Sequence, residues 1–532
     1  MKKIPLILCL VLALVGCGRA KSTTQQRLKV MSMYELLTPD PQKVYNSSDY
    51  KIIQSVFEGL VVPDPETMEP LPGVAERWTV SPDGKLYEFY IRDNARWSDG
   101  SPVTAENFVF AVQRALSSRF ACSNPELFFF VRNAREFFYR KIRDFSKVGI
   151  TAINSRTLRI ELAQCTPYFL NVLMHPCWSP LTQPIVESFE QFNKSFDAKN
   201  VIKLQIVSNG PFTFRERIPG DRLLMQKNIN YWDVENVLLD SVLFKCSSDQ
   251  STIIKAFSER EVDVAEVPLD SALAVGDYLK NGELIPSATF ECFALAINVD
   301  KPGLSDKRVR KALAFAINRE KMLQNIEKNE MFAAHSFIPS FGAYSRDDKL
   351  FLCNAQEARK LLAEAGYPNG SQLPEIKILF NESESKANAT ALENVAQDWR
   401  TQLGVKVSFE GKDFDSFHLY RKNREFSATK VSFRAMYCDP ALMLSVFSTN
   451  GSKNYGKWSD PNFDRMLAEI FATPDPLKRL TLVKSAEKYL VDNMPAIPLF
   501  FESKSYLVSN RVAGWYANIM NLHPLKFVYF AK

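Results

Sequence analysis

The stretch that most constrains this chain is residues 73–108, which read GVAERWTVSPDGKLYEFYIRDNARWSDGSPVTAENF. Residues 81–84 suit a type I turn, because proline presets φ at the second position and glycine fits the fourth. Residues 86–92 alternate between two faces, one of them strongly apolar, which predicts a strand. Thr104 then reads as the N-cap of a helix. The stretch therefore predicts a turn–strand–turn–helix unit.

The length of 532 residues exceeds what one simple core accommodates, and it suggests about two to four domains. With 46% hydrophobic and 24% charged residues, the composition is that of a globular protein rather than a disordered one. The formal net charge of +6 is small for this size. Because the basic residues are scattered and form no stripe, we expect no nucleic-acid partner.

The N-terminus has the pattern of a targeting segment. Lys2 and Lys3 precede an apolar run at residues 4–15, which is too short to span a bilayer as a helix. Residues 14–17, Leu-Val-Gly-Cys, look like a bacterial lipobox. We therefore predict a signal peptide over residues 1–16, lipidation of Cys17 and a tether over residues 17–29. The alternative is a plain signal peptide with an incidental cysteine.

Two helices in the second half can be predicted from their periodicity. Residues 305–326 predict one long helix with a single apolar face. Asn354 reads as the N-cap of another helix, with Glu357 three residues on and Gly366 just past the C-terminal end.

Signatures of enzymes are absent from the sequence. The four histidines form no HExxH motif, and there is no GxSxG elbow, P-loop or GxGxxG. A lone histidine is more often a structural residue than a metal ligand. We therefore interpret the chain as non-enzymatic, and we expect neither a cofactor nor a metal site.

The full string of residues 73–108 closely resembles the signature of the dipeptide- and oligopeptide-binding proteins that serve ABC importers, extracellular solute-binding family 5. Three further segments are similar to landmarks of that family: NGPFTFRERIPGDRLLMQKNINYW at 209–232, EARKLLAEAGYP at 357–368 and MPAIPLF at 494–500. The resemblance extends over residues 40–515, nearly the whole exported chain.

The resemblance implies an α/β fold of the two-lobed periplasmic-binding-protein type (type II, cluster C-like), with an extra α/β subdomain inserted in the first lobe. By this likeness lobe I would combine residues 30–57, 182–291 and 502–532. The inserted subdomain would cover residues 58–181, and lobe II would cover residues 292–501.

The implied function is that of the substrate-binding component of an importer. Such a protein captures short peptides in an interlobe cleft by hinge closure and delivers them to membrane permease subunits, while a separate ATPase supplies energy. We expect a monomer in the periplasm or cell envelope that touches the membrane only through its lipid anchor. An envelope enzyme, or a ligand sensor coupled to no transporter, is the rival class.

Carrying the family's site over residue by residue implies two ligand-binding segments. The first-lobe loop falls on Tyr45, Asn46 and Ser47, and the second-lobe segment falls on residues 430–440. The candidates in and beside that second segment are Arg421, Lys430, Ser432, Phe433, Arg434, Met436 and Asp439. Arg421 and Lys430 match basic positions that can engage a peptide carboxylate in relatives, although Arg421 is equally well explained as a surface cation.

Two of these positions depart from the family pattern. The Phe433 position is usually a tryptophan that lines the cleft. The Met436 position is usually an aspartate that pairs with the α-ammonium group of the peptide, and a methionine cannot neutralise that charge. Arg434 adds a positive charge beside it, unless it points away and pairs with a local acid.

Three interpretations of the methionine stay open. A nearby carboxylate, for which Asp439 is the candidate, could substitute. The ligand could lack a free α-amine, as a modified or peptidoglycan-derived peptide does. It could also be a non-peptide solute, since the wider family includes binders of nickel, haem and sugars.

A disulfide is implied only by the resemblance. Relatives carry one whose first cysteine resembles Cys292, and whose partner would fall near Arg434. Cys438 is the nearest cysteine, so a Cys292–Cys438 bridge is the resulting hypothesis.

Overall fold

The computed structural model describes residues 25–44, 47–193, 201–267, 277–278, 281–326, 331–346, 348–451 and 453–531. The predicted signal peptide, the lipidation site Cys17 and the ligand-loop residues Tyr45 and Asn46 lie outside these ranges. Within them, none of the helices combines the length and the apolar character needed to cross a bilayer.

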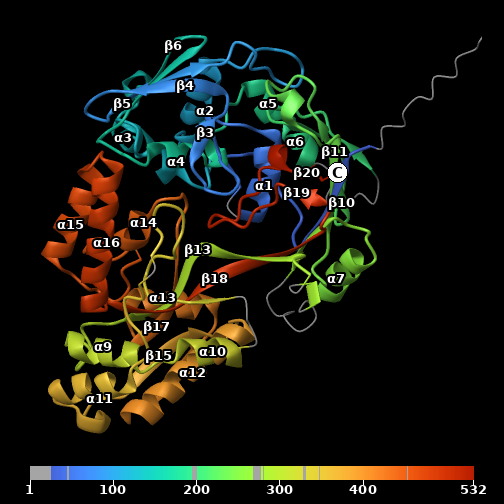
Figure 1. The fold of residues 1–532 in the computed structure, drawn as a ribbon. Helices are drawn as coiled ribbons and strands as arrows, with labels where there is room; N and C mark the ends of the chain where they lie inside the picture. The colour runs from blue at the N-terminus through green and yellow to red at the C-terminus, as the bar shows by residue number, and fades with distance from the viewer. Residues whose placement is uncertain are drawn as a thin grey trace, which may run out of the picture.

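One 12-stranded mixed sheet connects the two halves of the molecule (Figure 1). Its strands run in the order β16-β15-β17-β13-β18-β12-β1-β11-β10-β9-β8, and β14 pairs with β18 off this path. They are β1 (Arg27–Ser32), β8 (Ile202–Lys203), β9 (Phe212–Ile218), β10 (Arg222–Lys227), β11 (Ser241–Cys246), β12 (Val264–Val267), β13 (Leu284–Ile297), β14 (Phe332–Ala333), β15 (Ile376–Asn381), β16 (Val407–Lys412), β17 (Ala428–Arg434) and β18 (Ala496–Val508).

The longest strands, β13 and β18, pair antiparallel in the middle of this sheet. Figure 1 shows them running between the upper and the lower part of the molecule. The lobe boundaries predicted at 291/292 and 501/502 fall inside these two strands, so the chain passes between the lobes along continuous β-structure.

Helices cover both halves of the sheet (Figure 1). They are α1 (Ser47–Val56), α2 (Ala105–Ala115), α3 (Ala134–Phe138), α4 (Phe169–Leu173), α5 (Gln183–Ser188), α6 (Glu190–Asn193), α7 (Gln250–Ser258), α9 (Lys307–Phe315), α10 (Arg319–Asn325), α11 (Ala355–Glu364), α12 (Lys386–Leu403), α13 (Phe414–Asn423), α14 (Pro440–Ser445), α15 (Pro461–Ala472) and α16 (Pro476–Asn493).

A separate four-stranded antiparallel sheet, in the order β4-β5-β7-β6, forms the centre of the predicted inserted subdomain. Its strands are β4 (Ala75–Val80), β5 (Leu86–Ile91), β6 (Ile150–Asn154) and β7 (Thr157–Glu161). Short pairs are formed by β2 (Val61–Pro63) with β3 (Pro70–Pro72) and by β19 (Val512–Ala513) with β20 (Tyr529–Phe530).

The turn–strand–turn–helix unit predicted for residues 73–108 is confirmed. The Gly84 N–H donates to the Ser81 carbonyl oxygen at 2.9 Å, which closes the first turn. A capping box then joins Thr104 to Asn107 at the start of α2, so two orphan donors of the first helical turn are satisfied. Local turn and capping chemistry therefore determines this part of the fold.

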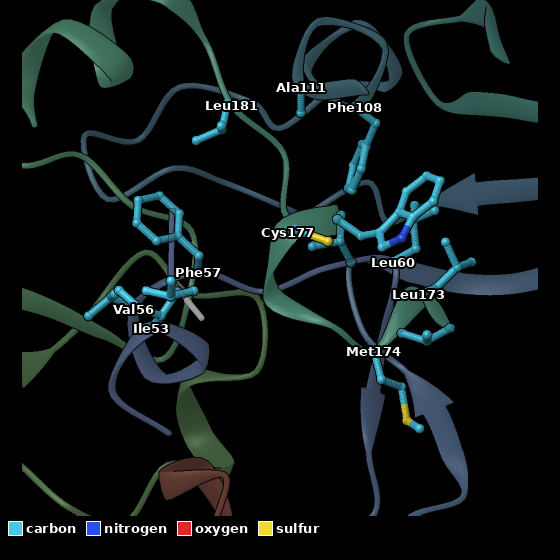
Figure 2. Close-up of a cluster of buried hydrophobic side chains, with 14 of the residues drawn as sticks. Ile53, Val56, Phe57, Leu60, Phe108, Ala111, Leu173, Met174, Cys177 and Leu181 are labelled. Carbon is cyan, nitrogen blue, oxygen red and sulfur yellow. The ribbon is translucent and has the colours of Figure 1, made fainter. Parts of the chain in front are cut away.

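The first half of the chain has one continuous core around α1 and α2. Figure 2 shows Ile53 and Val56 of α1, and Phe57 directly after it, in the same cluster as Phe108 of α2 and Leu173 of α4. A second large cluster is built mainly from residues 290–522. Each half of the molecule thus has a large hydrophobic core.

The prediction of one helix over residues 305–326 is wrong, because the structure has two helices there, α9 and α10. The break comes before α10 at Asn318, whose side chain accepts from the Lys321 N–H at 2.9 Å. The Asn318 N–H is itself held by Asp398 at 2.9 Å. Asparagine competes with the helix for backbone hydrogen bonds, and here it begins a new helix. Asn354 caps α11 as predicted.

The two halves also exchange buried side chains. Met68, which follows β2, belongs to the core of the second half, whereas Tyr437, which follows β17, belongs to the core of the first. Tyr437 stacks on Tyr168 with ring centroids 5.5 Å apart and planes 6° apart. The Asn171 side chain donates to the Cys438 carbonyl oxygen at 2.8 Å. The lobes are thus in direct contact beside the central strands.

Candidate functional site

A cavity of about 600 Å³ lies where the two halves meet. From the first half it is lined by Met33 and Tyr34 after β1, Tyr50 of α1 and the segment around Asn124. From the second half it is lined by parts of β13, β17 and β18. Small-molecule sites occupy about 300–1,000 Å³ and often lie between domains, so this cavity is the candidate ligand site.

Arg434 lies in this cavity with Glu291 as its partner. The two residues face each other directly across the β13–β17 pair, and the Arg434 Nε is 2.9 Å from the Glu291 Oε2. The Arg434 side chain is 53% exposed and that of Glu291 is 18% exposed. Arg434 therefore does pair with a local acid, as one sequence interpretation allowed, but both residues still line the cavity.

Met436 also lines the cavity, together with Tyr50. Both residues border a smaller apolar pocket as well, beside Met68 and Met174. Met436, at the position where the family pattern has an aspartate, thus lies at the candidate ligand cavity, and its side chain is uncharged.

Phe433 does not occupy the expected cleft position in this structure. Its side chain is 2% exposed and lies in the core of the second half, where its ring meets that of Phe447 at 4.9 Å. Side chains alternate along a strand, so Phe433 points away from the face that carries Ser432 and Arg434.

Asp439 does not provide the missing carboxylate either. It is buried as the N-cap of α14, and both of its side-chain oxygens accept hydrogen bonds from Arg479, at 2.6 and 2.8 Å. A carboxylate held by a bidentate arginine is already neutralised. Asp439 is absent from the described lining of the cavity, so the structure assigns it a structural task.

The other predicted residues are only partly brought together. The Lys430 ammonium lies 3.0 Å from the Glu384 Oε1, and Arg421 of α13 stacks on the rings of Phe417 and Tyr455. Neither these two residues nor Ser432 are among the described residues that line the cavity. Ser47 is the first residue of α1.

The hypothesis of a Cys292–Cys438 bridge is not supported, since both residues are free thiols in the structure. Cys292 lies directly opposite Phe433 on β17, and Cys438 comes after that strand has ended. A disulfide requires Cα atoms within about 7 Å and converging Cβ vectors. Burial raises the pKa of both thiols, so neither is activated as a thiolate.

Tyr50 is a cavity residue that the sequence analysis missed. Its hydroxyl lies 3.0 Å from the His175 Nε2, and the His175 Nδ1 accepts from the Cys177 N–H at 3.2 Å. Because Nδ1 accepts, the ring proton resides on Nε2 and is donated to the Tyr50 oxygen. Burial lowers the pKa of His175 to about 3, so the imidazole stays neutral and fixes the hydroxyl at the cavity wall.

Four charged cavity residues were missed as well: Glu126, Glu291, Glu502 and Lys504. The sequence did contain a signal for three of them. Glu291 is the one charged residue in the otherwise uncharged run of residues 284–297, and Glu502 and Lys504 recur at the strand period of two in residues 496–508. A charge on an otherwise apolar buried strand requires a partner or a function.

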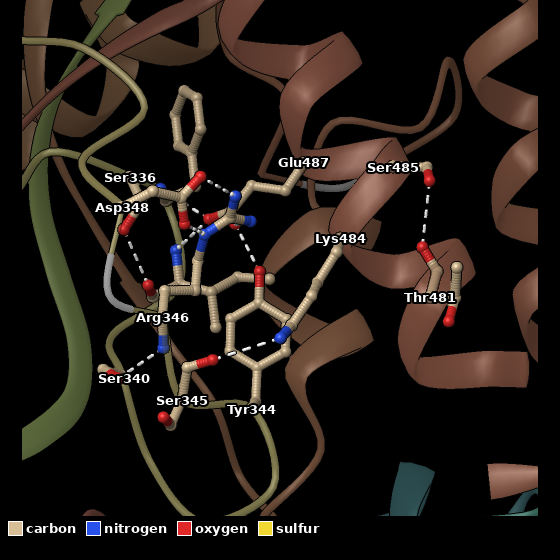
Figure 3. Close-up of polar contacts among 12 residues, drawn as sticks. Ser336, Ser340, Tyr344, Ser345, Arg346, Asp348, Thr481, Lys484, Ser485 and Glu487 are labelled. Atoms are coloured by element: carbon tan, nitrogen blue, oxygen red, sulfur yellow. Dashed lines mark hydrogen bonds and ion pairs between the residues drawn. The ribbon is translucent and has the colours of Figure 1, made fainter. Parts of the chain in front are cut away.

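A buried carboxylate anchors the loop of residues 336–346 (Figure 3). Glu487 of α16 accepts from the N–H groups of Phe337 and Ile338 at 2.9 and 2.8 Å, and from the Tyr344 hydroxyl. The same loop places the ring of Phe341 4.9 Å from that of Phe290, which lines the cavity.

Comparisons with known proteins agree with this architecture. The dipeptide-binding protein DppE of Bacillus subtilis is 29% identical, over 98% of this chain and 96% of that protein. The periplasmic oligopeptide-binding protein OppA of Salmonella typhimurium is 28% identical, over 93% and 90%. The periplasmic murein tripeptide-binding protein MppA in its unliganded open form superposes with a TM-score of 0.82 at 25% identity, over 96% and 98% of the two chains.

Residues 69–455 match the family described as bacterial extracellular solute-binding proteins, family 5 Middle. The mixed α/β fold, the two halves joined by β13 and β18 and the cavity between them are what a two-lobed binding protein requires. The chain belongs to family 5 of the bacterial extracellular solute-binding proteins.

Proposed function

We propose that this protein is the substrate-binding component of an ABC importer, capturing short peptides in the interlobe cavity and delivering them to a membrane permease. The observation that carries the proposal is the cavity of about 600 Å³, which both lobes line. Closing such a cleft around a hinge buries the ligand between the two lobes. Transport energy comes from a separate ATPase, and the chain itself performs no chemical step.

The cavity wall offers polar groups that suit a peptide main chain. Ser503 of β18 lines it, is 1% exposed, and its hydroxyl has no hydrogen-bond partner among the described residues. A buried hydroxyl without a partner is costly unless something binds it. The Tyr50 hydroxyl, held by His175, is a second polar group at the cavity wall. Main-chain hydrogen bonds would provide affinity without demanding one peptide sequence.

Native mass spectrometry of the purified full-length protein tests this proposal. We expect a co-purified adduct that leaves on denaturation and fragments as one peptide or a series of peptides. Adducts that are exclusively non-peptide solutes, together with no binding of added tripeptides, would contradict it.

A murein-type peptide is the second candidate ligand. Two observations favour it: the uncharged Met436 at the cavity, and the arginine two residues before it. Calorimetric titration with trialanine and with a murein tripeptide separates the candidates. Tighter binding of the murein peptide by at least about tenfold, or 1.4 kcal/mol, selects the second.

We also propose that Cys17 is lipidated and tethers a monomer to the membrane. The support is the pattern Leu-Val-Gly-Cys at residues 14–17 after an apolar run. A Cys17→Ser variant should lose incorporation of labelled fatty acid and leave the membrane fraction. Unchanged labelling would show that the modification lies elsewhere or does not occur.

A further inference from the structure

The charged residues of the cavity are not equivalent. The described lining contains three carboxylates, those of Glu126, Glu291 and Glu502. Glu291 is paired with Arg434 at 2.9 Å, and Glu502 also has a partner within the protein. Glu126 has no hydrogen bond or ion pair to any described side chain, and it is exposed. An incoming cation can therefore pair with Glu126 without breaking an existing contact.

The backbone that carries Glu126 is firmly held. Asn124 precedes the short 3-10 helix Pro125–Phe128, and its side-chain amide donates to the Val44 carbonyl oxygen at 3.2 Å. Leu127 and Phe128 are both buried, and Pro125 fixes its own φ angle. The Glu126 carboxylate thus belongs to a well-packed segment, residues 124–128. Binding a ligand there costs little conformational entropy, because the backbone is already ordered.

The segment of residues 124–128 borders the same cavity as Met436, the position at which the expected acidic anchor for an amine is missing. Tyr50 and Met436 line the same cavity as Asn124 and Glu126. The segment that carries Glu126 and the segment just after β17, which carries Met436, therefore border the same cavity.

We infer that Glu126 is the carboxylate that receives the α-ammonium group of a bound peptide, taking the place of an acidic side chain at Met436. This inference rests on the proposed peptide-binding function. A charge enclosed by two closing lobes is expensive unless it is paired, and the Arg434 guanidinium beside Met436 would repel an ammonium there. Closure would remove Glu126 from water and strengthen its attraction for the ligand.

Titration calorimetry of the purified full-length protein tests this role. The probes are trialanine and tetra-alanine, each with a free amine and in N-acetylated form. Glu126→Gln should weaken binding of the free-amine peptides by at least about tenfold, as expected for one charge-assisted hydrogen bond, and leave the acetylated peptides within about twofold. Glu136→Gln, an exposed glutamate of the same subdomain on α3, is the matched control and should change neither.

A second variant distinguishes the inference from a non-specific loss of binding. If Glu126 is the anchor, Met436→Asp should have little effect alone but should restore binding of free-amine peptides when combined with Glu126→Gln. If the wild-type protein binds the free-amine peptides and Glu126→Gln binds them equally well, the inference is overturned and the proposed function stays intact. A gain of about tenfold or more from Met436→Asp alone overturns it too. Failure of the wild-type protein to bind any of the four probes overturns both.

Discussion

Tyr168 and Tyr437 stack nearly in parallel, with their ring centroids 5.5 Å apart, although they belong to opposite halves of the molecule. Tyr168 comes from the inserted subdomain, and Tyr437 follows β17, one residue after the cavity residue Met436. Phe471 of α15 meets Tyr168 at 5.8 Å. The contact therefore joins the lobes directly beside the candidate ligand site.

Truncating this contact should destabilise the folded protein. We expect Tyr437→Ala to lower the free energy of unfolding by about 3–5 kcal/mol, because a buried aromatic side chain and its ring stack are both removed. Urea denaturation followed by tryptophan fluorescence measures the change. Leu477→Ala, at a side chain that is 77% exposed, is the control and should change the value by no more than about 0.5 kcal/mol. Equal effects of the two variants would contradict the packing described.

The buried Glu487 should matter for the loop of residues 336–346. Glu487→Gln loses the charged acceptor of Tyr344 and Arg346, and we expect a loss of about 3 kcal/mol, since a buried charge-assisted network is left incomplete. Thermal and urea unfolding measure it. Glu364→Gln, at the exposed end of α11, is the matched control. A stability equal to that of the control would show that the Glu487 contacts have no net value.

The structural task of Asp439 separates stability from binding. Asp439→Asn should lower the free energy of unfolding by about 2–3 kcal/mol, because Arg479 loses its buried counter-charge. Affinity for peptides should stay within about twofold, since Asp439 is not part of the described cavity lining. Calorimetric titration beside urea denaturation measures both quantities. A large loss of affinity with unchanged stability would instead place Asp439 in the ligand site.

Acid should destabilise the protein in part through His175. Burial lowers the pKa of its imidazole from 6.5 to about 3, so below pH 6.5 the unfolded chain binds a proton that the folded protein rejects. Stability therefore falls as the pH is lowered from 6.5 towards 3, by up to about 1.4 kcal/mol per pH unit for this one group.

The variant His175→Gln removes that contribution, so its free energy of unfolding should decline less steeply between pH 6 and pH 4. The control is His418→Gln, because His418 lies on the exposed side of α13. Partial burial and the neighbouring Arg421 also lower the pKa of His418, so this control should reduce the slope too, but less than His175→Gln does. Urea denaturation at a series of pH values gives the slopes. Parallel slopes for wild type and His175→Gln would contradict the buried, neutral histidine.

Local patterns predicted local structure well in this chain. The turn at Ser81, the α2 cap at Thr104 and the α11 cap at Asn354 follow from side-chain chemistry within a few residues. The same reasoning failed at Asn318, because apolar periodicity continued through a residue whose side chain begins a new helix.

The candidate site could be predicted only in part, since it depends on contacts between distant segments. The pairing of Arg434 with Glu291 is set by the β13–β17 register, over 143 positions of sequence. The alternation of side chains in β17 is visible in the sequence. The sequence does not show which face of the strand the core covers, and for that reason Phe433 was expected in the cleft. Glu126 comes from a third segment that no motif connects to β17.

Closure of the lobes around a peptide is the central claim, and small-angle X-ray scattering tests it most directly. The structure superposes well on an unliganded open form, so the ligand-free protein should have the larger radius of gyration. Scattering profiles of the full-length protein are compared with and without a peptide that calorimetry has shown to bind. We predict a smaller radius of gyration at saturation. An unchanged radius with the cavity demonstrably occupied would contradict the account.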